Sequence, residues 1–532
     1  MKNLILFFLT LLVITSELKA QTTRASDGSR ADVQAKIDLS SDTDIVTIPS
    51  GSFTWTSTVT ISGKGIKLQG AGASKVLGRS LSTVAFGASG TKTFTTTVSG
   101  LAIIAGDPLR IYRTNGEYGG GGGFGTGNGI WMDCTVTSYS GTSLVVSVTS
   151  ASPTGTGSYE VWSISTRPST RTEIISNTAS LIEITEDVSN SVEISGLDFV
   201  AGTSNGYLLT LNPTTNALPV LIHDSFFSIN SNTSVLDIKT NKGVIWNCTF
   251  ISPSISPAPL AIHHKAPGLT VSWATASTMG AADTTGKSNV YVEDCWFVGW
   301  LISSDSDDNA RTVFRRNYYD HAGVGTHGAD TSTYGVRHFE VYDCTFYHVN
   351  LGASSPNITQ WFYLRGGTFA ISDNVIPALD TSGNWGSPAT FKMTIQNLQR
   401  DAGPFGLWGD NISGNQVPAP RQVGYGNPTG ASSVLDPGSY AVHGVLEPVY
   451  MWNNTGTGSS TVSLSDYATP TGNQDSVTGY IRAGTEYYND GTAKPGYTKY
   501  TYPHPLRTGA TPSAFTSSLL GKIKLSGKAT IK

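Results

Sequence analysis

The sequence has little charge and little cysteine, and both shortages exclude classes of protein. Aspartate, glutamate, lysine and arginine together make up 14% of the 532 residues, against about 25% in a typical soluble domain. A formal net charge of −4 provides no overall basic field, which argues against a nucleic-acid partner. The four cysteines are too few for a disulfide scaffold, and none lies in a Cys-x-x-Cys pair, so a zinc site is not expected.

Long apolar runs are missing after the first twenty residues. Residues 1–20 read MKNLILFFLTLLVITSELKA, in which Lys2 precedes a short apolar stretch and Ala20 precedes the expected cut, the pattern of a secretory signal peptide. No later run approaches the ~18 apolar residues of a spanning helix. We therefore expect an exported chain, extracellular or at the cell surface, without membrane insertion.

A short pattern recurs along the chain: apolar, x, apolar, x, x, then Cys, Asn or a small residue, x, apolar. Most copies lie about 20–30 residues apart, the spacing of a stacked solenoid. The copies are VEISGLDF at 192–199, VLIHDSFF at 220–227, GVIWNCTF at 243–250, VYVEDCWF at 290–297, TVFRRNYY at 312–319, FEVYDCTF at 339–346, FAISDNVI at 369–376 and a weaker VYMWNNTG at 449–456.

A second apolar segment accompanies many of these copies, as in VLDIK at 235–239 and WFYLR at 361–365. Two to three strands per repeat, with no helical period, predict an all-β right-handed parallel β-helix. Its coils stack about 4.8 Å apart, so equivalent residues form ladders. We expect Cys248, Cys295 and Cys344 to be stacked core thiols in such a ladder.

The N-terminal part completes the pattern of a β-helix. DVQAKI at 32–37 is amphipathic and predicts a capping helix, and residues 44–55 and 59–72 predict the first strands. With these features the chain resembles the pectate-lyase-like β-helix superfamily over residues 30–87 and 167–507, a resemblance that implies the fold alone.

Residues 88–166 interrupt the coil spacing. Alternating strands around the loop GGGGGFGTGNG predict a small inserted antiparallel β module, which resembles modules of phage tail fibres. We divide the chain into a signal peptide (1–20), a cap with the first coils (21–87), the inserted module (88–166), the main β-helix with long loops (167–507) and a C-terminal tail (508–532).

Alternation along the second segment predicts which side chains leave the barrel. With Leu236 and Ile238 taken as inward, and their equivalents in other coils, the next outward positions form one column. Its members are Lys239, His263, Asp305, His327, Arg365 and, further on, His443.

A column of cationic and imidazole groups suits an anionic polymer, so we predict a polysaccharide partner, with uronate-containing polymers as the natural candidates. β-Elimination at a uronate needs a base and a positive charge that holds the developing anion. His327 or Lys239 is the candidate base and Arg365 the clamp, with Arg337 and His338 in support. His263 and His443 are candidate substrate-binding residues.

The first segment of each coil supplies a second outward column. Its members are His223, Trp246, Glu293, Arg315 and Tyr342. Trp246, Arg315 and Tyr342 are candidate sugar contacts, although ladder pairing on a sheet also accounts for such residues. Glu293 beside Arg315 predicts a surface ion pair.

Acidic residues leave two other interpretations open. SDSDDN at 304–309 offers Asp305, Asp307 and Asp308 as ligands for Ca²⁺, or forms a solvated acidic turn. The same residues with Asp330 offer carboxylates for a glycoside hydrolase. A third interpretation is an adhesin or tail-spike-like binder without turnover. The fold does not choose among lyase, hydrolase and binder, and the sequence predicts no oligomeric state.

Overall fold

The computed structural model describes residues 20–113, 130–152, 157–159, 161–176, 180–185, 190–201, 206–212, 218–229, 233–252, 260–266, 276–300, 302–320, 322–327, 335–347, 362–376, 392–398, 423–424, 446–456, 461–467 and 483–507. The predicted signal peptide up to residue 19, the predicted tail, Asp330 and His443 lie outside these residues.

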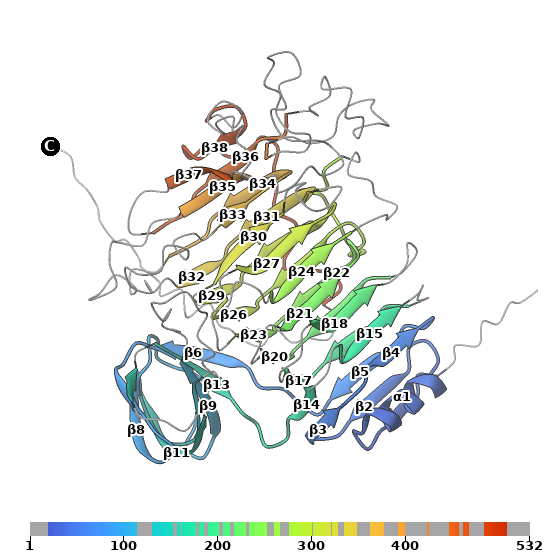
Figure 1. Cartoon of the computed structure of the whole chain (residues 1–532), viewed down its shortest axis with the longest axis vertical. Helices are drawn as coiled ribbons and strands as arrows, with labels where there is room; N and C mark the ends of the chain where they lie inside the picture. Colours follow the sequence, from blue (N-terminus) through green and yellow to red (C-terminus); the bar gives the residue numbers. More distant parts are fainter. Residues whose placement is uncertain are drawn as a thin grey trace, which may run out of the picture.

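Three long parallel sheets wind together into a solenoid along the longest axis of the molecule (Figure 1). Sheet A contains β1 (Thr23–Ala25), β2 (Ile45–Ile48), β5 (Lys67–Gly70), β16 (Glu193–Ser195), β19 (Val220–His223), β22 (Gly243–Trp246), β25 (Val290–Glu293), β28 (Arg311–Arg315), β31 (His338–Tyr342), β34 (Thr368–Ser372), β36 (Val449–Trp452) and β38 (Tyr487–Tyr488).

The other two sheets follow in each turn of the chain. Sheet B contains β3 (Gly51–Trp55), β14 (Thr172–Ser176), β17 (Leu197–Ala201), β20 (Phe226–Ile229), β23 (Thr249–Ile251), β26 (Trp296–Val298), β29 (Tyr318–Asp320) and β32 (Thr345–Tyr347). Sheet C contains β4 (Val59–Ser62), β15 (Ile182–Thr185), β18 (Gly206–Asn212), β21 (Thr233–Ile238), β24 (Ile262–Lys265), β27 (Ile302–Asp307), β30 (Gly323–Thr326), β33 (Phe362–Leu364), β35 (Lys392–Leu398) and β37 (Thr461–Tyr467).

The recurring pattern marks the corner between sheets A and B. One residue at each corner has a left-handed backbone, which Asp, Asn and Gly tolerate best: Gly196, Asp224, Asn247, Asp294, Arg316, Asp343, Asp373 and Asn453. The next residue points into the core. Cys248, Cys295 and Cys344 occupy this position as buried free thiols, so the predicted thiol stack is confirmed.

Aromatic rings form a ladder inside sheet B. Six rings stack with centroids 4.6 to 5.1 Å apart, close to the ~4.8 Å strand spacing: Phe199, Phe227, Phe250, Phe297, Tyr319 and Phe346. Helix α1 (Arg30–Leu39) closes the N-terminal end by placing Val33 and Ile37 in the same core. The capping helix predicted at 32–37 is therefore confirmed.

An antiparallel module is inserted between β5 and β14, where the chain would otherwise turn from sheet A to sheet B. Its strands are β6 (Val76–Ser80), β7 (Val84–Phe86), β8 (Gly90–Thr95), β9 (Pro108–Arg113), β10 (Trp131–Ser140), β11 (Ser143–Ser152), β12 (Gly157–Tyr159) and β13 (Trp162–Thr166). The predicted boundary at residue 88 falls inside the module, because β6 pairs with β13 and β7 with β12.

The module packs against the outer face of sheet B. Val76 and Tyr112 of the module share a buried apolar cluster with Trp296 and Tyr347 of sheet B. Arg79 pairs with Asp320 at 3.1 Å with both side chains almost fully buried. The predicted class, an all-β parallel β-helix with an inserted antiparallel module, is confirmed. No helix in the part of the chain described here has the length and apolar character to cross a membrane.

Candidate functional site

Two adjacent rows of outward side chains on sheet C form a polar surface that we call the sheet C strip. The inner row follows the strand register from β21 to β33 and consists of Asp237, His263, Asp305, Gly325 and Tyr363. The outer row lies two residues further along each strand and consists of Lys239, Lys265, Asp307, His327 and Arg365.

The structure thus brings together five of the residues predicted for one column, but distributes them over two rows. Lys239, His327 and Arg365 lie in the outer row, whereas His263 and Asp305 lie in the inner row. The prediction placed the outward positions of β24 and β27 two residues too early along the chain. Their inward positions hold polar side chains, with Ser304 opposite Ile262 and Ser306 opposite His264, so the apolar alternation was misleading there.

His263 contacts both a carboxylate and a tyrosine beside the strip. Its Nδ1 lies 3.0 Å from Oδ1 of Asp237 and 2.7 Å from the hydroxyl of Tyr207, whose ring stacks on the imidazole with centroids 5.4 Å apart. Burial raises the pKa of Asp237, but its contacts with His263 and Lys239 outweigh burial and hold that pKa below its ordinary value. An ionised Asp237 places the ring proton on Nδ1 and leaves Nε2 as the basic nitrogen.

His327 forms a second imidazole–carboxylate pair. Its Nδ1 lies 2.5 Å from Oδ2 of Asp305. The side chain of His327 is 23% exposed and that of Asp305 is 13% exposed. Burial raises the pKa of Asp305, but the charges of His327, Arg365 and His263 hold it below its ordinary value. Two imidazoles backed by ionised carboxylates therefore lie close together on one face.

The lysines of the outer row also have carboxylate partners. Lys239 Nζ lies 3.4 Å from Asp237 and is 37% exposed, and Lys265 Nζ lies 3.1 Å from Asp307. The guanidinium of Arg365 lies 5.0 Å from the centroid of the Tyr363 ring, and its Nε donates to the carbonyl oxygen of Thr326 at 2.7 Å. The strip is consequently a surface of alternating charge, where the sequence predicted a mainly cationic column with Asp305 as its one acidic member.

Arg337 and His338 do not belong to the strip. Arg337 is fully buried and makes a two-pronged pair with Glu447 at 2.9 and 3.1 Å. His338 is also fully buried, with Nδ1 3.2 Å from the hydroxyl of Ser277. The prediction that they assist at the surface was wrong. Both side chains are buried at the start of β31, where they bind Glu447 and Ser277.

The second predicted column exists in the predicted register, but it does not face solvent. His223, Trp246, Glu293, Arg315 and Tyr342 pair in order along sheet A. Residues 494–507 cross over this row, and Trp246, Arg315 and Tyr342 are at most 2% exposed. They are therefore not available as sugar contacts, and the Glu293–Arg315 pair is a buried ion pair rather than a surface one.

The acidic turn does not converge on a metal. Asp305 faces His327 and Asp307 faces Lys265, while Asp308 occupies a left-handed turn position. The described residues contain no group of three His, Cys, Asp or Glu side chains that could hold a metal ion. Two of the three carboxylates proposed for Ca²⁺, Asp305 and Asp307, are instead paired with His327 and Lys265.

Asp237 and Lys265 of the strip and the neighbouring Tyr207 were missed by sequence reasoning. Asp237 was missed because only the outward position after each apolar pair was considered, Lys265 because its coil was displaced by two residues, and Tyr207 because it lies in β18, a coil that contributed no residue to the predicted column. A correct alignment of His264 with Ile238 would have revealed Lys265 beside Lys239. The sequence contains Lys265 at the correct spacing, but this position is recognised only if His264 is placed in the core as an inward residue.

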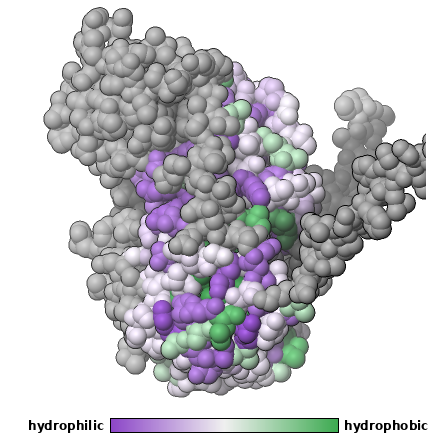
Figure 2. Space-filling view, turned by 90° about the vertical axis from the view of Figure 1, so that its right-hand side faces the viewer, coloured by the Kyte–Doolittle hydropathy of each residue, from purple (hydrophilic) through white to green (hydrophobic). Residues whose placement is uncertain are grey.

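Figure 2 shows the face that lies on the right in Figure 1, where hydrophilic residues occupy much of the described surface and hydrophobic ones form small separate areas. Large hydrophobic side chains that are exposed in the described part of the chain are limited to Leu39, Ile104 and Leu446. The described surface is thus suited to polar ligands.

No protein-family model matches the chain, and no curated protein matches it. Among solved structures, the tailspike gp61 of Pseudomonas phage phi297 aligns with a TM-score of 0.16 and 12% identity, over 69% of this chain and 72% of the tailspike chain. The tailspike gp49 of Pseudomonas phage LKA1 aligns with a TM-score of 0.16 and 14% identity, over 69% of this chain and 68% of that chain.

A third structure is the gp54 tailspike of Acinetobacter baumannii bacteriophage AP22 in complex with A. baumannii capsular saccharide. It aligns with a TM-score of 0.16 and 12% identity, over 81% of this chain and 66% of that chain. Likenesses at this score carry no argument about the present chain. Its own strand pairing and side chains define it as a parallel β-helix protein with an outward strip of histidine–carboxylate pairs.

Proposed function

We propose that the protein is an exported polysaccharide lyase that cleaves a uronate-containing polymer by β-elimination on the sheet C strip. The observation that carries this proposal is the geometry of His263, whose Nδ1 faces the ionised Asp237 while its Nε2 has no hydrogen-bonding partner among the described residues. An imidazole held in one tautomer by a carboxylate is a ready general base.

In the proposed reaction, Nε2 of His263 removes the proton next to the uronate carboxylate. The electron pair left on carbon forms the double bond as the bond from the neighbouring carbon to the glycosidic oxygen breaks. The departing oxygen takes up the proton of the neutral Tyr207 hydroxyl, which lies beside the base, and the tyrosinate is reprotonated from water as the proton on His263 is released to solvent. Burial and the charges of Asp237 and Asp305 raise the pKa of Tyr207, so it stays protonated at neutral pH.

Cations of the outer row supply the charge that such a reaction needs. Lys239 and Lys265 end neighbouring strands beside His263, with 37% and 30% of their side chains exposed. Elimination builds negative charge on the uronate carboxylate, and positioned cations stabilise it. The imidazole of His327, which is 23% exposed, extends the same row, whereas Arg365 is buried, so a bound polymer would meet Lys239, Lys265 and His327.

The geometry favours elimination over hydrolysis by paired aspartates. Asp237 and Asp305 lie two strands apart, about 9–10 Å along the sheet, near the upper end of the separation used by inverting hydrolases. Hydrolysis would need one of them to be protonated near neutral pH, with a raised pKa. Both carboxyls have a pKa below the ordinary value, so neither is a suitable acid.

The test compares single variants of the full chain on a panel of uronate polysaccharides, by the ultraviolet absorbance of the new conjugated double bond. We expect His263→Gln to reduce the initial rate by about 100-fold or more, the usual contribution of a general base, with the thermal transition unchanged. Glu183→Gln, a carboxylate further along the same ladder, is the matched control and should keep the full rate. Full activity of His263→Gln contradicts the proposal.

A polysaccharide-binding role without turnover is the second candidate, and the charge pairing within the strip favours it. Each lysine of the strip already faces a carboxylate, as in a surface built for hydrogen bonds to neutral and acidic sugars alike. In that case Lys265→Ala weakens sugar retention in a binding assay, while no polymer of the panel gains absorbance with the unmodified protein.

A further inference from the structure

Residues 494–507, which we call the C-terminal strap, cross the outer face of sheet A in the direction opposite to the order of the coils. Starting from the C-terminal end of the solenoid, the strap meets β31, then β28, then β25 and finally β22. The polar contacts of the strap with β31, β28 and β25 follow that order, and the Arg507 guanidinium lies 5.7 Å from the centroid of the Trp246 ring in β22. The polar contacts are made by Tyr497, Lys499, Tyr500, Thr501, Tyr502, His504 and Arg507.

Corner carboxylates are one set of partners of the strap. Lys499 Nζ lies 2.7 Å from both Asp343 and Asp373, which occupy the left-handed corners of two successive coils. The hydroxyl of Tyr502 donates to Asp294 at 2.7 and 2.8 Å, at an earlier corner. Carboxylates that the corner geometry favours for backbone reasons thus also hold the strap.

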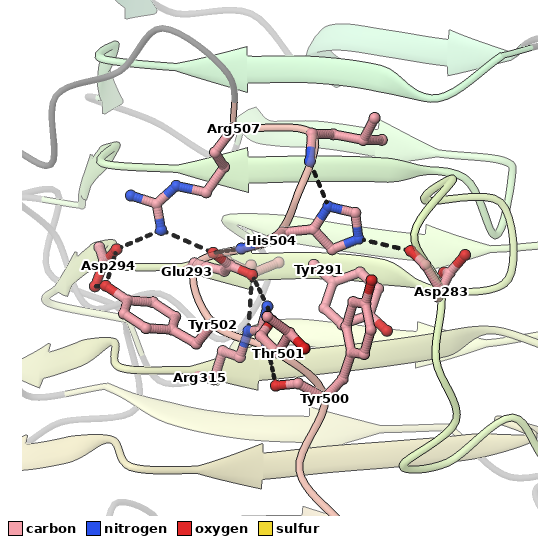
Figure 3. A network of polar contacts seen from close by, with 12 residues as sticks. Asp283, Tyr291, Glu293, Asp294, Arg315, Tyr500, Thr501, Tyr502, His504 and Arg507 are labelled. Carbon is pink, nitrogen blue, oxygen red and sulfur yellow. Dashed lines mark hydrogen bonds and ion pairs between the residues drawn. The ribbon is translucent and has the colours of Figure 1, made fainter.

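The centre of the contact is a buried charged network (Figure 3). Arg315 is fully buried, pairs with Glu293, and donates to the carbonyl oxygens of Tyr500 at 2.7 Å and Thr501 at 2.9 Å. Arg507 reaches back to Glu293 at 2.7 Å and to Asp294 at 2.6 Å. The strap therefore completes the hydrogen bonding of charges that would otherwise lie on the outside of sheet A.

A solenoid is held together mainly by contacts between neighbouring repeats, and its stability is close to a sum of such local terms. Chains of this kind can open from an end, one repeat at a time. The strap is different, because a segment of fourteen positions (494–507) makes contact with coils that lie several repeats apart. Its charged partners belong to coils that also carry Asp305 and His327 on sheet C.

We propose that the C-terminal strap is a clasp that joins the coils from β22 to β34 into one cooperative unit, so that these coils open together. This inference concerns the fold and does not depend on the proposed lyase activity. It predicts that loosening the strap lowers protection from hydrogen exchange in strands the strap covers, and leaves the coils before β22 unaffected.

The experiment uses the full chain with Arg507→Met and Lys499→Met combined, and measures amide hydrogen exchange by mass spectrometry. We expect exchange to rise at least about tenfold in the strap and in β25, β28 and β31, with no change in β14 to β20. Tyr502→Phe removes a single hydroxyl and should give a smaller change in the same strands, which keeps the test useful if the double variant folds poorly.

Lys67→Met is the matched control, because Lys67 makes an ion pair with Glu193 on sheet A at 2.7 Å outside the strap. It should leave exchange in β25, β28 and β31 as it is in the unmodified chain. The inference is overturned if the strap amides become exchangeable while these strands stay protected, or if the strap stays protected without Arg507 and Lys499. A uniform rise along the whole solenoid also overturns it.

Discussion

Individual side chains in the strip owe their chemical state to carboxylate neighbours more than to exposure. His263 and His327 each face an ionised aspartate, and burial beside Asp237 and Asp305 raises the pKa of Tyr207 further above neutral pH. A base, a neutral acid and flanking cations therefore coexist within a few strands. The structure adds what the residue types alone do not give, namely that these groups lie within a few strands of one another.

Asp237 is expected to matter for turnover although it does not touch the reacting atoms. Asp237→Asn removes the charge that fixes the tautomer of His263, so we predict a rate loss of about 100-fold with little change in the concentration of polymer at half-maximal rate. Initial rates at several polymer concentrations measure both. An Asp237→Asn protein with the unmodified rate would show that the pairing has no part in catalysis.

Glu340 is expected to make stability depend on pH. It is buried, accepts from Tyr497 at 2.6 Å and from the backbone N–H of Gly280 at 3.1 Å, and burial raises its pKa to about 7. Because the folded chain holds this proton more tightly than the unfolded chain, the contribution of Glu340 to stability is present below the ordinary pKa and declines as pH rises toward 7. Lys494 and Arg315 face the same carboxyl and limit this effect.

The measurement is the melting temperature of the unmodified chain and of Glu340→Gln between pH 4.5 and 8. The unmodified chain should lose stability relative to the variant as pH rises through this range. A constant difference across the range would mean that Glu340 does not titrate there.

Strands and corners were predictable because each carries its own local signal. Alternation predicted the strands, and the recurring Cys, Asn or small residue after two apolar positions predicted the corners, including the positions of Cys248 and Asn317. Register across sheet C was less predictable. His264 points inward, where it lies 2.7 Å from Thr312 and 2.8 Å from the carbonyl of Thr240, and burial lowers its pKa to about 3. A neutral, hydrogen-bonded histidine replaces an aliphatic residue, and no periodicity of apolar residues can reveal it.

The amide at the corner after β28 should be important for stability. Asn317 accepts from the backbone N–H of Cys295 at 2.9 Å and donates to the carbonyl of Val292 at 3.0 Å. Asn317→Ala leaves both buried groups without a partner, at a cost of about 1–3 kcal/mol for each. Chemical unfolding measures the loss. Cys248→Ala, at an equivalent corner without an amide, should cost less, and equal losses would contradict the role given to the amide.

The molecule as a whole is a solenoid stabilised on two outer faces, by the inserted module on sheet B and by the strap on sheet A. On sheet C, Lys239, Lys265 and His327 keep 23% to 37% of their side chains exposed, while Asp237, Asp307 and Arg365 are buried beside them. Sequence spacing located the module but placed its start twelve residues late, at 88 instead of Val76. The reason is that β6 follows the preceding strands at a similar spacing along the chain. The strap was not predictable, because it has no repeat and its partners lie far apart in sequence.

The docking of the module depends on the buried pair between Arg79 and Asp320. Arg79→Met alone leaves Asp320 buried without its cation, which should cost about 3–5 kcal/mol, whereas the double change Arg79→Met with Asp320→Leu should recover much of that loss. Chemical unfolding of the four proteins in this cycle measures both effects. If the single and double variants are equally unstable, the pair does not act as an ion pair.

The most direct test of the proposed function is the ultraviolet absorbance of the purified protein incubated with a panel of uronate polysaccharides. Elimination on the strip predicts rising absorbance from a new conjugated double bond with at least one polymer, in step with new reducing ends. New reducing ends without absorbance would contradict elimination and indicate hydrolysis. Neither signal, together with measurable binding of the same polymers, would contradict catalysis and leave the strip as a binding surface.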